Sequence, residues 1–180
     1  GSPGLVKDAD DAEKIANDIG YPVLLKSVYG GGGRGIRLVS NDKELQEGFE
    51  TVTSESIAAV GKSAIIVEKF LEKTRHIEYQ MCRDKHGNTV HLFERECSIQ
   101  RRNQKLIEQT PSPVVDDAKR EEIGELVVKA AQAVDYTNLG TAEFLRADSG
   151  EFYFIEINAR LQVEHPISEM VSGLDFVKLQ

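Results

Sequence analysis

Gly140-Thr-Ala-Glu143-Phe-Leu-Arg146-Ala-Asp-Ser-Gly150-Glu-Phe-Tyr-Phe-Ile-Glu156-Ile-Asn158 contains two apolar runs on either side of a polar turn with a glycine. This pattern is typical of a β-hairpin. With Ser149-Gly150 as a two-residue loop, Glu143 faces Glu156 across the ladder at about 5 Å, and Asn158 points to the same side. Carboxylate and amide oxygens are ligands that suit Mg²⁺. The spacing alone leaves two interpretations open, a metal-binding face and a pair of solvated carboxylates.

The alternation of polar residues continues after Asn158, through Arg160, Gln162 and Glu164, next to apolar neighbours. If the backbone stays extended, these side chains point to the same face as the predicted metal ligands. A cation, an amide and a carboxylate in line suit a reaction that joins a phosphate-bearing site to a small anion. We therefore predict an anion site beside the metal-binding face.

The composition is that of an ordinary globular protein. The 180 residues, 40% hydrophobic and 29% charged, suffice for one domain or two small ones. A formal net charge of −8 argues against nonspecific binding of nucleic acid. No apolar run approaches the ~20 residues of a membrane span, and no signal peptide opens the chain. Cys82 and Cys97 lack metal-type spacing, which favours reduced thiols in a cytoplasmic or mitochondrial-matrix protein.

The order of the predicted elements indicates an α+β fold in two lobes. Periodicity and capping signals predict helices at 8–19, 41–60, 116–134 and 166–172, strands at 21–28, 36–39 and 64–70, and a hairpin with strands at 76–83 and 89–98. We place the division between the lobes after Val67, so that residues 1–67 form the first lobe and residues 68–180 the second. The stripe predicted to be buried on the helix at 116–134 consists of Ile123, Leu126, Val127, Ala130 and Val134.

A glycine-rich loop, Gly30 to Gly35, joins two predicted strands. Glycine lets backbone N–H groups approach an anion closely, but the loop lacks the Gly-Lys-Ser/Thr ending of a P-loop and opens no helix. It therefore indicates a flap over phosphates, with a flexible hairpin tip as the alternative. Lys26, on the preceding strand, is either a phosphate contact or an edge residue. The densest positive cluster is Arg101, Arg102 and Lys105, for which a solvated basic loop is the usual explanation.

Several strings in the sequence are shared with one enzyme family. They are Lys26 with the loop Gly30 to Gly35, Glu68-Lys-Phe-Leu71, Arg75-His-Ile-Glu78, Glu94-Arg-Glu-Cys-Ser-Ile-Gln-Arg-Arg-Asn-Gln-Lys105, Gly140-Thr-Ala-Glu143-Phe and Glu156-Ile-Asn-Ala-Arg-Leu-Gln-Val-Glu-His-Pro166. Together they resemble biotin carboxylase, the ATP-grasp component of biotin-dependent carboxylases such as the acetyl-CoA, propionyl-CoA and pyruvate enzymes. The resemblance covers essentially the whole chain.

This resemblance implies an ATP-grasp fold, with a small lid lobe and a larger lobe built on a mostly antiparallel sheet. It implies that ATP contacts Lys26, Gly31, Gly32, Gly33, Gly35, Glu68, Lys69, Leu71, His76, Gln100 and Leu145. The implied ligands of Mg²⁺ or Mn²⁺ are Glu143, Glu156 and Asn158, in agreement with the hairpin. The implied bicarbonate site consists of Arg160, Gln162 and Val163, and the implied catalytic residues are Lys105, Arg160 and Glu164.

In the implied reaction Glu164 deprotonates bicarbonate, which attacks the γ-phosphate of ATP and gives carboxyphosphate, while Lys105 contacts the transferred group. Carboxyphosphate breaks down to CO₂, which carboxylates biotin on a carrier domain, and a carboxyltransferase subunit or domain uses the product. Full members of the family have further domains on both sides, so we expect a fragment with little or no turnover, taken from an oligomeric parent. Another ATP-grasp ligase such as carbamoyl-phosphate synthase, and a nucleotide-binding module without catalysis, are the alternatives. The run Gln162-Val-Glu-His165 argues against the first alternative and intact catalytic positions argue against the second.

Overall fold

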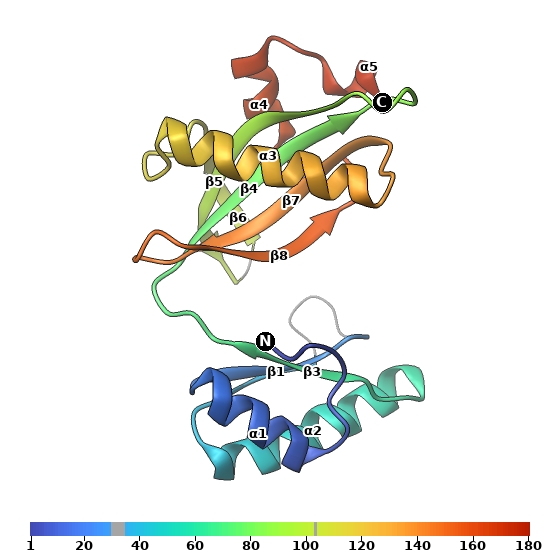
Figure 1. Cartoon of the computed structure of the whole chain (residues 1–180), viewed down its shortest axis with the longest axis vertical. Helices are drawn as coiled ribbons and strands as arrows, with labels where there is room; N and C mark the ends of the chain where they lie inside the picture. Colours follow the sequence, from blue (N-terminus) through green and yellow to red (C-terminus); the bar gives the residue numbers. More distant parts are fainter. Residues whose placement is uncertain (30–34, 103) are drawn as a thin grey trace. The chain divides into compact units, whose positions relative to one another are not determined.

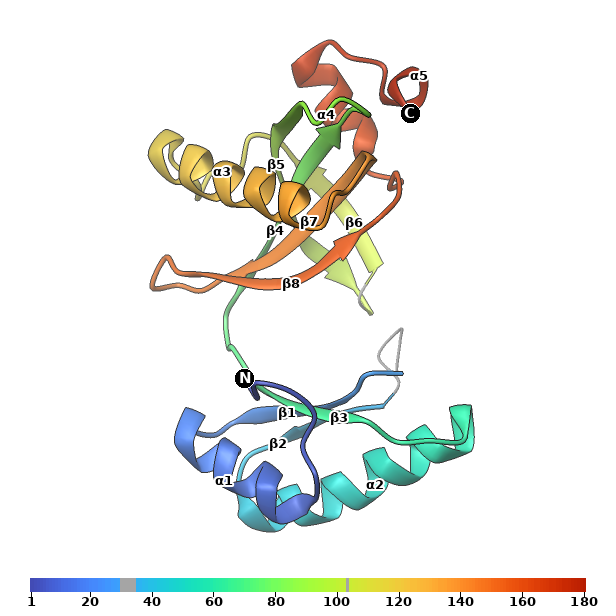
Figure 2. The same cartoon turned by 45° about the vertical axis from the view of Figure 1, so that its right-hand side comes forward.

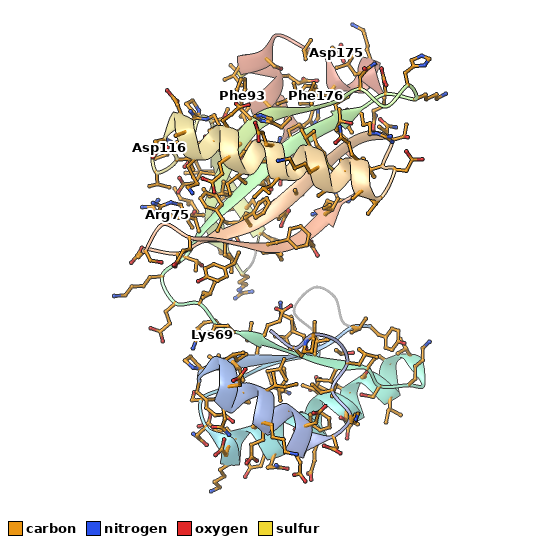
Figure 3. All side chains as sticks on the ribbon, viewed as in Figure 1. Lys69, Arg75, Phe93, Asp116, Asp175 and Phe176 are labelled. Carbon is orange, nitrogen blue, oxygen red and sulfur yellow. The ribbon has the colours of Figure 1, made fainter. Side chains whose placement is uncertain are left out.

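The structure, a computed structural model, describes residues 1–29, 35–102 and 104–180 (Figure 1). It divides into two compact units, Gly1–Glu72 and Lys73–Gln180. The division predicted after Val67 falls within strand β3 (Ile65–Lys69), whereas the structure keeps the whole of β3 in the first unit. Figure 3 labels Lys69, at the end of β3, and Arg75, where the first strand of the second unit begins.

The first unit is a three-stranded antiparallel sheet with two helices on one face (Figures 1 and 2). The sheet has the order β2-β1-β3, with β1 at Val23–Ser27 and β2 at Ile36–Val39, and the helices are α1 (Ala9–Ile19) and α2 (Asp42–Val60). Each helix begins at a polar cap, because Asp8 accepts the Asp11 N–H at 2.8 Å and Asn41 accepts the Glu44 N–H at 3.0 Å. The core between the layers includes Ala12, Ala16, Val23, Leu25, Leu45, Val52 and Val67.

The second unit is a five-stranded antiparallel sheet in the order β6-β5-β4-β7-β8. Its elements are β4 (Arg75–Arg83), β5 (Thr89–Arg101), β6 (Gln104–Gln109), α3 (Asp117–Ala133), β7 (Asn138–Arg146), β8 (Phe152–Asn158), α4 (His165–Ser172) and α5 (Phe176–Leu179). The predicted α+β class with antiparallel strands is confirmed. Two elements were not predicted. The basic segment pairs with the end of β5 as strand β6, and a short helix α5 begins at the fully buried Phe176 (Figure 3).

Helix α3 lies across one face of this sheet (Figures 1 and 2). Asp116 caps its start, as predicted, and accepts the Lys119 N–H at 2.8 Å (Figure 3). The predicted buried stripe was too wide. Leu126 and Val134 are 51% and 68% exposed and Ala130 is also exposed. The reason is that only a narrow stripe with a four-residue repeat faces the sheet, namely Ile123, Val127 and Ala131, together with Gly124.

The β7–β8 hairpin has the predicted pairing of Glu143 with Glu156, but its turn differs from the prediction. The Ala147 N–H donates to the Glu151 carbonyl and the Gly150 N–H donates to the Ala147 carbonyl, both at 2.9 Å, so the loop consists of residues 148–150 and the predicted two-residue loop is wrong. Gly150 has φ +96°, a conformation that favours glycine. A register shift between Glu143 and its neighbour then inserts one extra residue in β8. This bulge compensates for the longer loop, and Glu143 faces Glu156 as predicted.

The residues of β4 alternate between two buried faces of the sheet. Ile77, Tyr79 and Met81 belong to the core beneath α3, so Glu78 and Gln80, both 0% exposed, point to the opposite face. Buried polar groups need hydrogen-bond partners, and the candidate site supplies them on this second face. Within the described ranges, every helix is too short or too polar to cross a lipid bilayer.

Candidate functional site

One charged residue from each of four neighbouring strands lies in a single row across the sheet. The register pairs Arg95 of β5 with Glu78 of β4, Glu78 with Glu143 of β7, and Glu143 with Glu156 of β8. Directly opposed like charges destabilise a sheet unless cations or hydrogen-bond donors lie between them. The row therefore depends on the groups that surround its three carboxylates.

Lys105 of β6 is the cation shared by the carboxylates of the site. Its ammonium lies 2.9 Å from Glu143 Oε1 and 2.6 Å from Glu164 Oε1, and it also contacts Glu78 Oε2. The lysine side chain is 17% exposed. Burial opposes the charged form, but the charge of Glu78 and the hydrogen bonds to all three carboxylates outweigh it and raise the pKa of Lys105. Lys105, predicted only from the family resemblance, thus lies among acidic groups and is no solvated loop residue.

Glu143 accepts hydrogen bonds from three predicted site residues. Its Oε1 accepts from Gln162 Nε2 at 2.9 Å and from Asn158 Nδ2 at 3.1 Å, besides Lys105. Asn158 Nδ2 also lies 3.3 Å from Glu156 Oε1. The prediction that Glu143, Glu156 and Asn158 converge on one face is therefore confirmed as geometry.

His76 of β4 adds a second positive charge beside the row. Its Nε2 lies 3.1 Å from Glu143 Oε2 and 3.8 Å from Glu78 Oε2. Burial favours the neutral ring, but these two carboxylates outweigh burial and raise the pKa of His76 to about 9. Burial likewise disfavours the Glu143 carboxylate, yet His76 and Lys105 lower the pKa of Glu143 to about 2. The site therefore holds charged partners at neutral pH.

The donor set fits a hard divalent cation. Glu143, Glu156 and Asn158 provide two carboxylates and an amide, and rotation of the Asn158 amide by half a turn directs its oxygen to the same place. A second group also fits, since His76, Glu78 and Glu143 each offer one ligand atom, all within 4.8 Å of one another. Glu143 is common to both groups, whereas a further set of potential ligands, Glu78, Cys97 and Glu164, does not include it.

Glu78 and Arg95 belong to the site although sequence reasoning did not assign them to it. Both are fully buried, and Arg95 Nε donates to Glu78 Oε1 at 2.6 Å. Burial disfavours the Glu78 carboxylate, but His76 and the charges of Arg95 and Lys105 outweigh it and lower the pKa of Glu78. A sequence signal was present, because His76, Glu78 and Gln80 form a polar period-two pattern inside an otherwise apolar strand.

The strand alternation predicted beyond Asn158 is wrong. Strand β8 ends at Asn158, and the chain turns through residues 159–164 before α4 begins. Arg160 is exposed, and its Nη1 donates to the carbonyl of the adjacent Leu161 at 3.2 Å. Gln162 and Glu164 still reach the site, because the turn brings them over the polar face.

The other predicted residues of the second unit lie in varied surroundings. Leu145 is the register partner of His76, which puts both on one face of the sheet. Gln100 pairs with Lys105 in the β5–β6 ladder. Val163 is 92% exposed in the turn before α4.

In the first unit, the predicted nucleotide contacts lie along β1 and β3. Lys26 and Glu68 form an ion pair between these adjacent strands. The Lys69 ammonium donates to the carbonyls of Gly20 and Tyr21 at 2.8 and 2.9 Å, so its side chain is occupied by the unit's own backbone. Gly35 has φ +69° and Leu71, just past β3, is half-buried. The predicted contacts Gly31, Gly32 and Gly33 lie outside the described residues.

The fold and the oxygen-rich site define an ATP-grasp type of nucleotide-binding domain. A family model described as the ATP-binding domain of the carbamoyl-phosphate synthase L chain matches residues 1–180, and the chain belongs to this family. The fold class implied by the sequence motifs is thereby confirmed.

Two curated relatives illustrate the similarity. The chain is 51% identical over 180 residues to the 2-oxoglutarate carboxylase small subunit of Hydrogenobacter thermophilus, and 52% identical over 177 residues to the biotin carboxylase of a Nostoc species. These matches take in 100% and 98% of the chain but only 38% and 40% of the two relatives. The resemblance to biotin carboxylases is confirmed, and the chain spans well under half the length of these relatives.

Solved structures agree with this result. The biotin carboxylase domain dimer of the Hydrogenobacter thermophilus 2-oxoglutarate carboxylase, in complex with MgADP, ADP and bicarbonate, matches with a TM-score of 0.93 and 51% identity, over 99% of this chain and 40% of that one. The biotin carboxylase of Campylobacter jejuni in a β,γ-ATP complex matches with a TM-score of 0.93 and 48% identity, over the same shares.

Proposed function

We propose that the chain is the nucleotide-binding part of a biotin carboxylase, an ATP-dependent ligase that carboxylates biotin on a carrier protein with bicarbonate. The observation that carries this proposal is the carboxylate row of Glu78, Glu143 and Glu156, with Lys105 bound to Glu78 and Glu143, in a chain that is about half identical to carboxylases throughout its length. Those relatives favour this reaction over carbamoyl-phosphate synthesis.

In this proposal Glu143, Glu156 and Asn158 hold Mg²⁺ or Mn²⁺, which neutralises charge on the transferred phosphoryl group when bound. Lys105 contacts the γ-phosphate and later carboxyphosphate. Its three carboxylate partners orient the ammonium, which can exchange one of them for a phosphate oxygen. The protein thus offers a positioned point charge next to the metal ligands.

The turn before α4 supplies the bicarbonate side of the site. Gln162, Arg160 and the Val163 backbone bind the anion, and Glu164 removes its proton so that a bicarbonate oxygen can attack the γ-phosphate. Support comes from Glu164, which lies 2.6 Å from Lys105 and therefore beside the group that contacts the phosphate. The products are ADP and carboxyphosphate, whose breakdown releases the CO₂ that carboxylates biotin.

In this proposal the first unit is the lid lobe of the ATP-grasp fold. Lys26 and the loop with Gly31, Gly32, Gly33 and Gly35 contact the phosphates, Glu68, Lys69 and Leu71 surround the adenine, and His76, Gln100 and Leu145 complete the contacts from the second unit. Lys26 would exchange Glu68 for a phosphate, as Lys105 does in the second unit.

The parent protein, in this proposal, is an oligomeric enzyme that works with a biotinylated carrier domain and a carboxyltransferase. Because the chain spans about 40% of its biotin carboxylase relatives, the isolated chain should bind Mg·ATP with little or no turnover. We propose a reducing compartment, either the cytoplasm or the mitochondrial matrix, on the sequence spacing of Cys82 and Cys97.

A chimera tests the proposed reaction. The segment of the Nostoc biotin carboxylase that matches this chain is replaced by the chain itself, and ADP release is measured with and without biotin and bicarbonate. We expect release that depends on both, and its loss in the same chimera carrying Glu164→Gln. A chimera that folds and binds Mg·ATP but releases no ADP in response to biotin contradicts the proposal.

Calorimetry on the chain itself tests the metal face. Titration of Mg·ATP into the wild type and Glu156→Ala should show at least tenfold weaker binding by the variant. Glu151→Ala is the matched control, because Glu151 directly precedes the same hairpin strand and its side chain hydrogen-bonds to Ser149 and Tyr153 instead of to the site. Equal affinity of the wild type and Glu156→Ala removes Glu156 from the site.

A further inference from the structure

Arg95 is a fully buried cation whose every N–H group has a partner. Its Nε donates to Glu78 at 2.6 Å, and its Nη1 donates to Gln80 Oε1 and Ser168 Oγ, both at 2.8 Å. Its Nη2 donates to Thr141 Oγ1 and Gln162 Oε1, both at 3.3 Å. A guanidinium carries five N–H groups in a rigid planar fork, so these five bonds use the whole group.

The five partners come from separate parts of the chain. Glu78 and Gln80 lie on β4, Thr141 on β7, Gln162 in the turn after β8, and Ser168 in α4. The bonds to Gln162 and Ser168 lie on either side of Glu164 in the sequence, so Arg95 ties down both ends of the segment that carries this carboxylate. No lysine can copy this arrangement, because its single nitrogen has three donors at one point.

Gln162 is the amide partner of Arg95 that also contacts a predicted metal ligand. Its Oε1 accepts from Arg95, and its Nε2 donates to Glu143 Oε1 at 2.9 Å. A side-chain amide without such partners can turn over and present oxygen where nitrogen was. Turned over, Gln162 would direct its oxygen at the Glu143 carboxylate and repel it. Arg95 therefore acts together with Glu143 to determine the orientation of the Gln162 amide, with its nitrogen toward Glu143.

We propose that Arg95 is a positioning residue of the Mg·nucleotide and bicarbonate site, which holds the Gln162 amide toward Glu143 and the Glu164 segment over the carboxylate row. The inference rests on the proposed function, because the ligands are those of a biotin carboxylase. Arg95 itself touches no substrate in this arrangement, since its donors are all occupied within the protein.

The test compares the Arg95→Lys variant of this chain with the wild type by two measurements. The first is the pair of Gln162 side-chain amide proton resonances in ¹⁵N–¹H NMR spectra, assigned from their absence in Gln162→Glu. The second is calorimetric titration with Mn·ADP. We expect the Gln162 resonances to shift and the affinity for Mn·ADP to fall about tenfold to a hundredfold, as for other residues that orient metal ligands.

Arg120→Lys is the matched control. Arg120 also binds a fully buried glutamate, Glu94, through its Nε and Nη2, but it contacts neither Gln162 nor Glu143. The Arg120→Lys substitution should change the free energy of unfolding without shifting the Gln162 resonances or changing the affinity for Mn·ADP. If Arg95→Lys does not fold, the pair Arg95→Met with Glu78→Gln replaces it and is compared with Glu78→Gln alone, because the pair removes both charges and leaves no unpaired charge buried at position 78.

A folded Arg95 variant with unchanged Gln162 resonances overturns the proposal, and so does one that binds Mn·ADP within twofold of the wild type. Failure of the proposed function has a different signature. In that case the wild type itself does not bind Mn·ADP, and the NMR comparison alone decides whether Arg95 orients Gln162.

Discussion

Replacing Lys105 by methionine should destabilise the second unit strongly when divalent ions are absent. The substitution removes the cation from three carboxylates whose side chains are 0% (Glu78), 10% (Glu143) and 8% (Glu164) exposed, and it keeps most of the apolar stem. Removal of one partner from a buried ion pair costs about 3–5 kcal/mol. Because Arg95 still neutralises Glu78, we expect the lower end of this range, about 3 kcal/mol.

The assay is urea denaturation at pH 7 in EDTA, followed by circular dichroism, with hydrogen exchange of β4 and β7 peptides to report on the second unit. Lys129→Met is the control, because Lys129 Nζ lies 3.6 Å from Glu125 with both side chains more than half exposed, and such pairs contribute about 0–1 kcal/mol. Excess Mn²⁺ should stabilise Lys105→Met more than the wild type, since the ion replaces the missing charge.

The pH dependence provides a further check on the same variant. The lowered pKa of Glu143, about 2 in the wild type, means that its ion pairs stabilise the fold above the unfolded pKa of about 4.3. That contribution disappears as the pH falls toward 2. The stability difference between the wild type and Lys105→Met should therefore shrink in acid. A difference below about 1 kcal/mol at pH 7, with an unchanged m-value, would refute the role of Lys105 as the shared counter-ion.

Three further predictions concern His76, Gly124 and Arg160. His76 has a pKa of about 9 in the fold, above its unfolded value of about 6.5. The charged ring therefore contributes up to about 3 kcal/mol to the free energy of unfolding, in full below pH 6.5, and this contribution is lost as the pH rises through 9. Urea denaturation at pH 6 and pH 10 should show this loss in the wild type and not in His76→Gln. In Gly124→Ala the new Cβ meets the His91 ring at 2.5 Å, and we expect thermal unfolding to show destabilisation of about 1–3 kcal/mol, relieved when His91→Ala is added. Arg160→Ala should leave stability within about 0.5 kcal/mol, because the side chain is exposed, but should lower bicarbonate-dependent ADP release in the chimera; unaltered release excludes Arg160 from the bicarbonate site.

The convergence of Glu143, Glu156 and Asn158 was predictable because it depends on neighbouring strands of one hairpin. Side chains alternate with a period of two, and a short turn determines which residues face each other. The predicted pairing of Glu143 with Glu156 is correct although the predicted turn is one residue too short, because the bulge in β8 compensates for the longer loop. Local patterns of this kind also predicted the three helix starts next to Asp8, Asn41 and Asp116 to within one residue.

Two errors had different causes: one pattern was continued past the end of its strand, and the other was drawn too wide on its helix. Alternation beyond Asn158 required extended backbone, and the chain turns there instead. The stripe on α3 was drawn from apolar character alone, which does not reveal how wide a contact the sheet makes. Leu126 and Val134 are apolar but remain exposed.

The sequence by itself determined the family motifs, the α+β order of elements and the pairing of Glu143 with Glu156, because each follows from residues close together along the chain. Only the tertiary structure decided that Glu78 and Arg95 lie at the centre of the site and that Lys105 joins three carboxylates. Those contacts bring together β4, β5, β6, β7 and the turn before α4. Their physical cause is the packing of distant strands into one sheet, which buries the charges and makes each of them depend on its partners.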